Sequence, residues 1–445
     1  MCTQGASASA GHDYRGDERQ NAAVADAMTA AARLARNRRH YLVLVLLCFL
    51  VVAAIVSRRP DAVLRAQFWA EDGVVWFAQN YNLGVPTALS MTQAGYFHTF
   101  PRLAAALALL PPLSQAPLVM NLLAIAAQAL PACFLLTRRF EHLASSSSRL
   151  LMVVLLLAIP TSFEVHANVT NSMWFLALTA FLVLIAAPPA NTAWRVFDVA
   201  MLALSGTTGP FCLLLLPIAV IQFLVRRQSW TRVLLGILCV AVVFQSAALF
   251  TGWAHRTPAP LGATPRLFVA IVAGRIIVSP VLGLEFLLRH PAIAGPVCAL
   301  AFVGAGLLAI YAILKAPLEL RLVILFGSLV AGASLLSPLV AAPNEPSWPP
   351  LADPRVAGRY WLIPVASFLW ICVWTLGRER PLVVRAIGSL LIASALWTGI
   401  SYWRYAPFEN LHFSSYAAEF QRVRAGQDFT FPINPRGWNM VLRKR

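Results

Sequence analysis

Apolar residues form runs of about 17 to 25 along almost the whole chain, and short polar or basic segments separate these runs. In lipid, such runs satisfy their backbone groups only as helices. The pattern therefore predicts an all-α fold and a polytopic integral membrane protein. Eleven transmembrane helices are expected, at residues 41–57, 116–136, 150–163, 173–188, 196–208, 211–225, 233–251, 294–314, 319–341, 360–376 and 382–401.

Two segments do not fit a simple alternation of spans and loops. Residues 58–115 contain the short apolar stretch FPRLAAALALLPPL, which prolines interrupt, and we expect a long outer loop with juxtamembrane helices. Residues 266–290 carry Arg275 in their middle, and a crossing there would invert every later cluster of basic residues. For this segment we expect an interfacial or re-entrant helix.

Charge sets the predicted topology. The Arg-rich stretch ARLARNRRH precedes the first span and places the N-terminus in the cytoplasm. Residues 1–40 are polar and lack the apolar core of a signal peptide, which predicts a disordered cytoplasmic tail before a transmembrane domain over 41–401. Later basic residues then fall at inner ends, namely Arg149, Arg195, Arg226, Arg227, Arg232, Lys315, Arg321, Arg378, Arg380 and Arg385. The expected location is the inner membrane of a bacterium, with several passes and with residues 402–445 as a periplasmic tail.

The amino-acid composition supports a membrane protein and argues against a nucleic-acid-binding protein. Of the 445 residues 59% are hydrophobic and only 12% charged, against about 25% charged in soluble domains. The net charge of +17 would suggest nucleic acid in a soluble protein, but here the basic residues lie in short clusters between apolar runs. They are read as topology signals, and no nucleic-acid partner is predicted.

Most of the polar residues between the predicted spans lie in segments on the predicted outer side. Residues 58–115, 252–293, 342–359 and the C-terminal tail are substantial outer segments, whereas the predicted inner loops are short. A transporter builds matching access on both faces, commonly from two related halves, and no such halves are visible. The asymmetry favours a protein that works on its outer face. The tail sequence FPINPRGWNMVLRKR predicts a short strand or hairpin at the headgroup surface.

The stretch FWAEDGVVW places Glu71 and Asp72 between Trp69 and Trp76. Tryptophan favours the headgroup level, so the two carboxylates are expected near the membrane surface, where a lowered dielectric shifts pKa values. A carboxylate there suits a general base that takes a proton from a hydroxyl or amine. A solvated acidic pair that caps a helix is the plainer interpretation.

Two further polar groups accompany this motif. His98 and Arg102 follow it in YFHTFPR, and Glu164 and His166 lie in TSFEVHANVTNSMW, between two apolar runs. Polar groups at such positions are costly unless they face a cavity or one another. They are predicted substrate or phosphate contacts, with an interfacial histidine and a polar turn as the alternatives.

Basic residues dominate the later outer segments. Arg256 lies in one of them, and NEPSWPPLADPRVAGRYW supplies Arg355, Arg359 and Tyr360. Arginine forks match phosphate oxygens in two-point contacts, although Arg359 and Tyr360 could also simply anchor a helix to headgroups. Acids in the first outer loop and arginines in later ones are expected for transfer of a sugar from a lipid phosphate.

Cofactor signals are weak. The seven cysteines lie in the N-terminal tail or inside apolar runs without a CxxC pair, which argues against disulfides and zinc. Glu164 and His166 alone supply two ligands, which do not make a metal site. No metal and no cofactor is predicted, and nothing in the sequence indicates a divalent cation.

With these motifs the chain resembles the GT-C superfamily of membrane glycosyltransferases, which contains the protein O-mannosyltransferases and the aminoarabinose transferases of lipid A. The resemblance lies in the cytoplasmic N-terminus, the motif AEDG in a long first outer loop, and the stretch YFHTFPRLAAALALLPP before the second span. NVTNSMWFLAL and SGTTGPF also look like stretches of bacterial membrane proteins with this layout.

The resemblance implies a polyprenyl-phosphate sugar donor, inversion at the anomeric carbon and an acidic residue of the first loop as base. The implied partners are this lipid-linked donor, membrane lipids, and a glycan, lipid or protein acceptor. Family members often carry Asp-Glu or Asp-Asp, so either Asp72 or Glu71 is the expected base, with Asp72 favoured.

Three other function classes remain open on the sequence. A flippase or exporter would move a lipid-linked glycan unchanged, and an O-antigen polymerase or ligase would use a pyrophosphate carrier. A non-catalytic scaffold in envelope assembly is the third. Comparing monophosphate with pyrophosphate donors separates the enzymes, and the absence of any transferred sugar marks the flippase.

Overall fold

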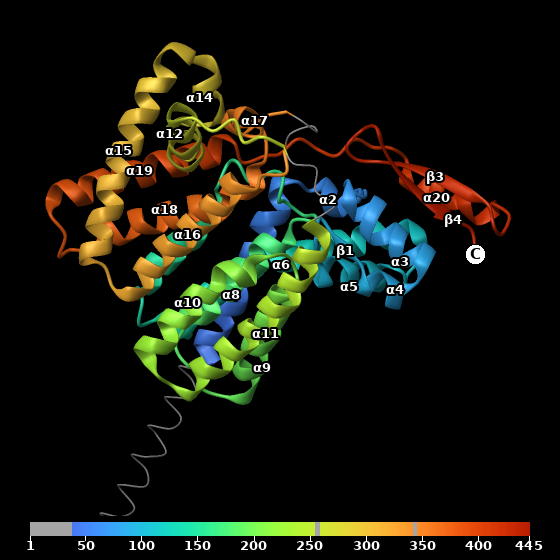
Figure 1. Cartoon of the computed structure of the whole chain (residues 1–445), viewed down its shortest axis with the longest axis horizontal. Coiled ribbons are helices and arrows are strands. Elements are labelled where there is room, and N and C mark those ends of the chain that lie inside the picture. The colour runs from blue at the N-terminus through green and yellow to red at the C-terminus, as the bar shows by residue number, and fades with distance from the viewer. Residues whose placement is uncertain (1–37, 254–258, 341–344) are drawn as a thin grey trace, which may run out of the picture. The chain divides into compact units, whose positions relative to one another are not determined.

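The computed structural model describes residues 38–253, 259–340 and 345–445, and the expected cytoplasmic tail lies almost wholly outside them. The predicted all-α fold is confirmed, because the structure is 71% helical and its described sheets are two small hairpins (Figure 1). After the helix Arg38–Arg58 the elements are α2 (Asp61–Leu64), η1 (Asp72–Phe77), α3 (Ala78–Leu83), α4 (Val85–Ser90), β1 (Thr92–Gln93), β2 (Tyr96–Phe97), α5 (Thr99–Ala108), η2 (Leu113–Gln115), α6 (Ala116–Leu135), η3 (Arg138–Phe140), α7 (Ser146–Leu157), α8 (Ser172–Ile185), α9 (Thr192–Gly206), α10 (Phe211–Arg226), α11 (Ser229–Trp253), α12 (Pro265–Ala273), η4 (Gly274–Val278), α13 (Ser279–Leu282), α14 (Leu284–Arg289), α15 (Pro291–Lys315), α16 (Leu318–Leu336), α17 (Trp348–Ala352), η5 (Gly358–Trp361), α18 (Leu362–Thr375), α19 (Leu382–Ser401), α20 (Phe413–Arg422), β3 (Asp428–Ile433) and β4 (Trp438–Arg443).

The described part of the chain has seven helices long and apolar enough to cross a membrane, so the expected count of eleven is not confirmed. These seven are Arg38–Arg58, Leu113–Leu135, Ser229–Thr251, Pro265–Leu282, Pro291–Lys315, Leu318–Leu336 and Leu382–Ser401. Other predicted spans form apolar helices such as α7 and α8, which have 12 and 14 residues. A crossing of the hydrocarbon core takes about 20 helical residues, so these helices are too short to be counted by length alone.

The segment 266–290, expected at the interface, is helical and contains one of the seven candidate spans, Pro265–Leu282. The arginine in the middle of this segment, Arg275, is buried and does not face lipid. The Arg275 guanidinium donates from Nη2 to the carbonyl of Val356 at 2.6 Å and from Nη1 to the carbonyl of Asp353, and it lies 5.6 Å from the Trp361 ring. A charge in an apolar helix is thus solvated by backbone carbonyls of a neighbouring loop, so a crossing is compatible with Arg275.

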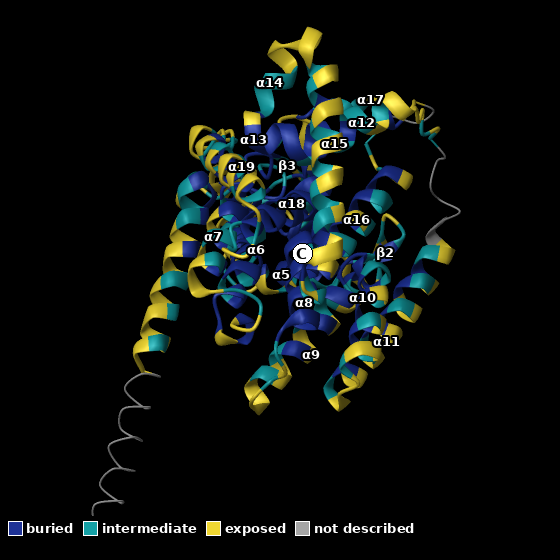
Figure 2. Cartoon of the chain, turned by 90° about the vertical axis from the view of Figure 1, so that its left-hand side faces the viewer, coloured by how far each residue is buried: buried dark blue, intermediate teal, exposed yellow. Residues whose placement is uncertain are grey.

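Two short helices form the centre of the bundle. All residues of α8 except Met173 and all of α18 except Trp374 are buried. Helix α16 packs against α18, and Phe326 stacks on Phe181 of α8 at 4.8 Å. Exposed side chains gather instead on peripheral helices such as α11 and α15 (Figure 2). Because these exposed side chains are largely apolar, the peripheral helices present a surface suited to lipid.

Arg226, one of the basic residues assigned to inner ends, and Arg139 lie at the C-terminal end of α8. Arg139 forms an ion pair with Asp198, and its Nε donates to the carbonyl of Ala187. Arg226 donates to the carbonyl of Ile185 at 3.0 Å and pairs with Glu319 at 3.3 Å. The N-terminus of α8 follows the loop at residues 158–171, about 21 Å away at 1.5 Å per residue. The basic end and this loop therefore lie at opposite ends of the central helices.

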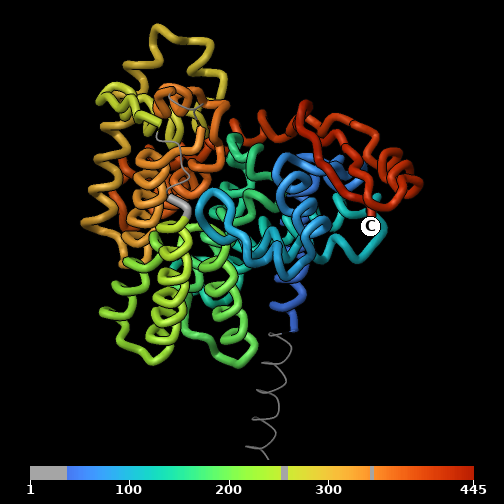
Figure 3. Tube along the Cα trace, turned by 45° about the vertical axis from the view of Figure 1, so that its right-hand side comes forward, coloured from blue at the N-terminus to red at the C-terminus, as the bar shows by residue number. Residues whose placement is uncertain are grey.

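The predicted C-terminal hairpin is confirmed. Strands β3 and β4 are antiparallel with a register from Asp428↔Arg443 to Ile433↔Trp438, and the tail belongs to the same compact unit as the first outer loop. Its apolar face shares a core with η1 and α3, and Figure 3 shows the red tail beside the blue segment. Asn434 accepts from the backbone N–H of Ala70 and donates its own to Phe68, so the tail fixes the backbone beside the acidic motif.

Candidate functional site

Asp72 is buried, with 1% of its surface exposed, and is bound to the loop 158–171. Its Oδ2 accepts from the backbone N–H of Val169 at 3.0 Å. Its Oδ1 accepts from the N–H and the hydroxyl of Thr170 at 2.9 and 2.6 Å. Burial raises the pKa of Asp72 to about 7, although the bonds from Thr170 and Val169 oppose the shift. This carboxyl titrates near neutral pH, but both of its oxygens are occupied.

Glu71 differs from its neighbour in accessibility. Its side chain is partly exposed, and none of the hydrogen bonds or ion pairs found among the described residues involves its carboxylate. It precedes η1, a π-helix, and π-helical turns frequently occur at functional sites. Of the two acids, Glu71 is therefore the one that a bound molecule can reach.

Backbone strain marks three segments of the candidate site. Ala70, Ala167 and Ala357 have φ values of 40°, 52° and 54°, a left-handed conformation that costs a residue other than glycine about 1 kcal/mol or more. Each lies within two residues of predicted site residues, namely Glu71 and Asp72, His166, and Arg359. Such strain persists only where surrounding contacts hold it, and it clusters at functional sites.

Glu164 joins the loop 158–171 to the segment before α18. Its Oε2 accepts from the backbone N–H of Arg359 at 3.0 Å, and its Oε1 pairs with the Arg359 guanidinium. Burial alone would lower the pKa of Arg359, but Tyr360 and Glu164 outweigh it and raise the pKa. The Tyr360 hydroxyl accepts from the backbone N–H of Leu339 at 2.9 Å. The charge of Arg359 is thus already balanced by Glu164, which favours a structural role over phosphate binding.

His166 is buried on the other side of the same loop. Its Nδ1 lies 3.3 Å from Nε2 of Gln128, and its Nε2 is buried without a hydrogen-bond partner among the described residues. Burial, together with Arg59 and Arg58, keeps the pKa of His166 well below its usual value. The ring is neutral and stands 5.1 Å from the Tyr405 ring.

Arg58 and Arg59 are a pair of buried cations beside His166, with 2% and 6% of their surface exposed. Arg58 donates from Nε to the carbonyl of Trp403 at 3.1 Å and from Nη1 to that of Leu157, while its buried Nη2 has no partner in the described structure. Arg59 donates from Nε to the carbonyl of Ala406 at 3.1 Å.

Aromatic rings flank these two guanidinium groups. Arg58 lies 4.2 Å from the Tyr405 ring and Arg59 4.4 Å from the Phe408 ring. No carboxylate of the described residues lies within ion-pair distance of either; Asp61 acts on Arg59 only at longer range. Two adjacent buried cations without a counter-ion are costly, and a bound anion would relieve that cost. Phe408 also stacks on Trp69 at 5.3 Å, which connects the cations to the acidic motif.

His98 and Arg102 pack against the ring of Trp76, which is linked to Asp72 through Thr170. The His98 ring lies 4.7 Å from Trp76, and its pKa falls to about 3 because of burial and the nearby Arg102. Arg102 is fully buried, donates to Oε1 of Gln79 at 2.9 Å and has its pKa lowered to about 10 by burial. The indole N–H of Trp76 donates to the hydroxyl of Thr170, which in turn binds Asp72. His98 is uncharged at neutral pH, so it cannot attract phosphate by charge.

A cavity of about 230 Å³ is lined mainly by α8, α10 and α16, with Tyr96 of β2 and Tyr360 of η5 at its border. Tyr96, Trp174, Phe211 and Tyr360 contribute aromatic rings to its lining, and the Trp174 ring is 5.6 Å from that of Tyr360. The buried indole N–H of Trp174 has no partner among the described residues. Such a cavity offers ring faces and one free donor to a bound molecule.

The remaining predicted residues stand apart from this arrangement. Arg355 is exposed and pairs with Asp353 at 2.6 Å, a bond that lowers the pKa of Asp353. Arg256 lies outside the described residues. Of the predicted cations, only Arg102 and Arg359 therefore have described side chains in contact with the groups that surround the loop 158–171.

Sequence reasoning missed Arg58, Arg59, Thr170 and Tyr405. A signal for the first two was present, because they follow the far end of the first apolar run, opposite the Arg-rich stretch that sets its orientation. Cations on that side are exceptions to the positive-inside rule and need another explanation. Thr170 and Tyr405 carry no comparable signal.

Within residues 38–253, 259–340 and 345–445, no group of three or more His, Cys, Asp or Glu side chains is arranged to hold a metal ion. Comparison of the sequence with protein-family models and with curated proteins gave no match.

Proposed function

We propose that this protein is a membrane glycosyltransferase that moves a sugar from a polyprenyl-phosphate donor to an envelope acceptor on the periplasmic face. The proposal depends on one observation, namely that the acidic motif and the buried Arg58 and Arg59 are both linked to the loop 158–171. Asp72 binds the loop 158–171 directly, and Arg58 donates to the Ser162 hydroxyl of the same loop. Arg59 is linked to the acidic motif through the Phe408 ring, which stacks on Trp69. An acid and two cations without an ion-pair partner among the described residues, held by one loop, suit transfer from a phosphate.

Glu71 acts as the general base in this proposal. A base must first reach the proton that it removes, and only then does its pKa matter. The pKa of Asp72 is favourable, but three hydrogen bonds and burial keep its oxygens from an acceptor. Asp72 instead fixes the start of η1 against the loop 158–171 and so positions Glu71.

In this proposal Arg58 and Arg59 hold the phosphate of the donor after it displaces the Tyr405 and Phe408 rings that cover their guanidinium groups. Glu71 takes the proton of the acceptor hydroxyl, and the acceptor oxygen forms a bond to the anomeric carbon. The bond between that carbon and the phosphate oxygen breaks, and its electron pair leaves with polyprenyl phosphate. The guanidinium groups stabilise the negative charge on this leaving group, which is their largest contribution to the rate.

The test uses the full-length protein in lipid nanodiscs with a panel of radiolabelled polyprenyl-phosphate sugars and envelope extracts as acceptors. Transfer of label and release of polyprenyl phosphate are the expected results. Movement of the lipid-linked sugar across the membrane without transfer would instead indicate a flippase. Activity with pyrophosphate donors alone would indicate a polymerase or ligase.

Variants then test the assigned roles. Glu71→Gln should lower turnover by at least about 100-fold, within the range for loss of a general base. Arg59→Gln should mainly weaken donor binding. Glu141→Gln and Arg355→Gln are matched controls, because both side chains are exposed and outside the site. Wild-type turnover in Glu71→Gln would remove Glu71 from the base role.

A further inference from the structure

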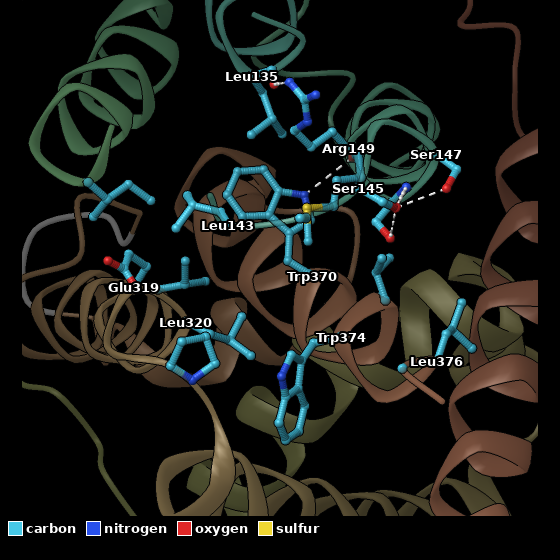
Figure 4. A pocket seen from close by; sticks show the side chains of 18 of the residues that line it. Leu135, Leu143, Ser145, Ser147, Arg149, Glu319, Leu320, Trp370, Trp374 and Leu376 are labelled. Atoms are coloured by element: carbon cyan, nitrogen blue, oxygen red, sulfur yellow. Dashed lines mark hydrogen bonds between the residues drawn. The ribbon is translucent and has the colours of Figure 1, made fainter. Parts of the chain in front are cut away.

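A larger cavity, of about 460 Å³, lies at the basic end of the bundle (Figure 4). Its lining includes Ile185 and Glu319, which both contact Arg226 at the end of α8 distant from Asp72. Because of this location, the cavity is separate from the candidate site around the loop 158–171. Its volume is in the range of about 300–1,000 Å³ that is usual for sites that bind small molecules.

The cavity is amphipathic. Trp370 and Trp374 from α18 and Leu320 from α16 line it with apolar surface, and Figure 4 shows their side chains around one space. Hydroxyl groups stand at another part of the lining, where Ser145 Oγ lies 2.9 Å from the Ser147 hydroxyl. A molecule that fits this lining has both an apolar and a polar part.

The lining contains two arginines, Arg149 and Arg378, and two acids, Glu319 and Glu379. The two acids are already paired, Glu319 with Arg226 at 3.3 Å and Glu379 with Arg380 at 3.1 Å. Arg378, also in the lining, is exposed and has no ion pair within the described residues.

Arg149 adds a second cation without a carboxylate partner. It is 3% exposed, and its Nη1 donates to the carbonyl of Leu136 at 3.2 Å, while its Nε is buried without a hydrogen-bond partner in the described structure. Arg149 and Arg378 are thus two cations of the lining without an ion-pair partner among the described residues, and this favours the binding of an anion.

We propose that this cavity binds the headgroup of an anionic phospholipid. The phosphate contacts Arg378 and the hydroxyls of Ser145 and Ser147, and the glycerol and first acyl carbons lie against Trp370 and Trp374. Tryptophan favours the headgroup level, and basic pockets between membrane helices bind anionic headgroups. The apolar wall favours a lipid over free phosphate. This proposal does not depend on the glycosyltransferase proposal.

The experiment measures binding to the delipidated full-length protein in neutral detergent. Brominated phosphatidylglycerol, brominated phosphatidylcholine and inorganic phosphate are titrated separately, with quenching of tryptophan fluorescence as the readout for the lipids and calorimetry for all three. Phosphatidylglycerol should bind saturably and at least about tenfold more tightly than phosphatidylcholine. Both lipids carry the phosphate, but the choline cation of phosphatidylcholine is repelled by Arg149 and Arg378. Trp374→Phe should remove part of the quenching.

Two variants and one control locate the site. Arg378→Gln should weaken phosphatidylglycerol binding about tenfold, and Ser147→Asp should weaken it further by adding a negative charge. Arg232→Gln is the matched control, because Arg232 is exposed and is not in the lining. Equal affinity for both lipids, or unchanged binding in Arg378→Gln and Ser147→Asp, would overturn the proposal. Inorganic phosphate binding as tightly as the lipid would exclude a lipid site.

Discussion

Replacing Thr170 with valine removes one hydroxyl and breaks two partly buried hydrogen bonds while the volume of the side chain stays nearly constant. The hydroxyl donates to Oδ1 of Asp72 at 2.6 Å and accepts from the indole N–H of Trp76 at 2.8 Å. A bond to a charged group contributes about 1.5–3 kcal/mol, and a neutral one about 1 kcal/mol. Asp72 and Trp76 are each 1% exposed, whereas Thr170 is partly exposed, so water replaces the lost partner only in part.

We therefore expect Thr170→Val to lower the free energy of unfolding by about 3 kcal/mol, or about 100-fold in the equilibrium constant. Because the hydroxyl lowers the pKa of Asp72, the pKa in the variant should also rise above about 7. Denaturant titration of helical circular dichroism in detergent, at several pH values between 5 and 8, measures both effects.

Thr170→Ser is the matched control, because it keeps the hydroxyl and should retain most of the stability. A free energy of unfolding for Thr170→Val within about 0.5 kcal/mol of the wild type, the usual effect of a neutral surface substitution, would show that these two hydrogen bonds do not stabilise the fold. If the stability of Thr170→Val depends on pH in the same way as that of the wild type, only the expected rise in the pKa of Asp72 would be contradicted.

Three further outcomes can be measured by the same titration. Glu164→Gln should cost about 2 kcal/mol, because it breaks a partly buried ion pair with Arg359, and a double-mutant cycle should show that the loss is coupled. Gly358→Ala should cost about 1–3 kcal/mol, since a Cβ there would lie 2.5 Å from the carbonyl oxygen of Thr161. The folded-state pKa of Asp72 is raised to about 7 from 3.8, so wild-type stability should fall relative to Asp72→Asn as pH rises from about 4 to about 7.

Each of these predictions has a contrasting result. Gly236→Ala is the control for the glycine substitution, because nothing lies within 4 Å of the added carbon, and it should be neutral or slightly stabilising. Additive effects in the Glu164 and Arg359 cycle would show that the pair contributes no coupling energy. A stability difference between wild type and Asp72→Asn that is constant over this pH range would contradict the raised pKa.

The order of hydrophobic and polar residues determined much of this protein by itself. It predicted the helical class, the membrane environment and the C-terminal hairpin, because hydropathy and local turn chemistry act over a few residues. It also assigned Arg149 and Arg226 to the same end of the helices, and both bind backbone carbonyls at helix C-termini, Arg149 after α6 and Arg226 after α8. The number of spans was not determined, because short buried helices and long lipid-facing ones are similarly apolar.

Only the tertiary structure decided which predicted side chains are free to act. Asp72 binds residues 97 and 98 positions away, and Arg58 contacts Trp403, 345 positions away. Such contacts enclose Asp72 and neutralise Arg359, whereas Arg58 and Arg59 have no ion-pair partner in the described part of the chain. Burial and partner choice depend on how distant segments pack together, and no local pattern in the sequence encodes those distances.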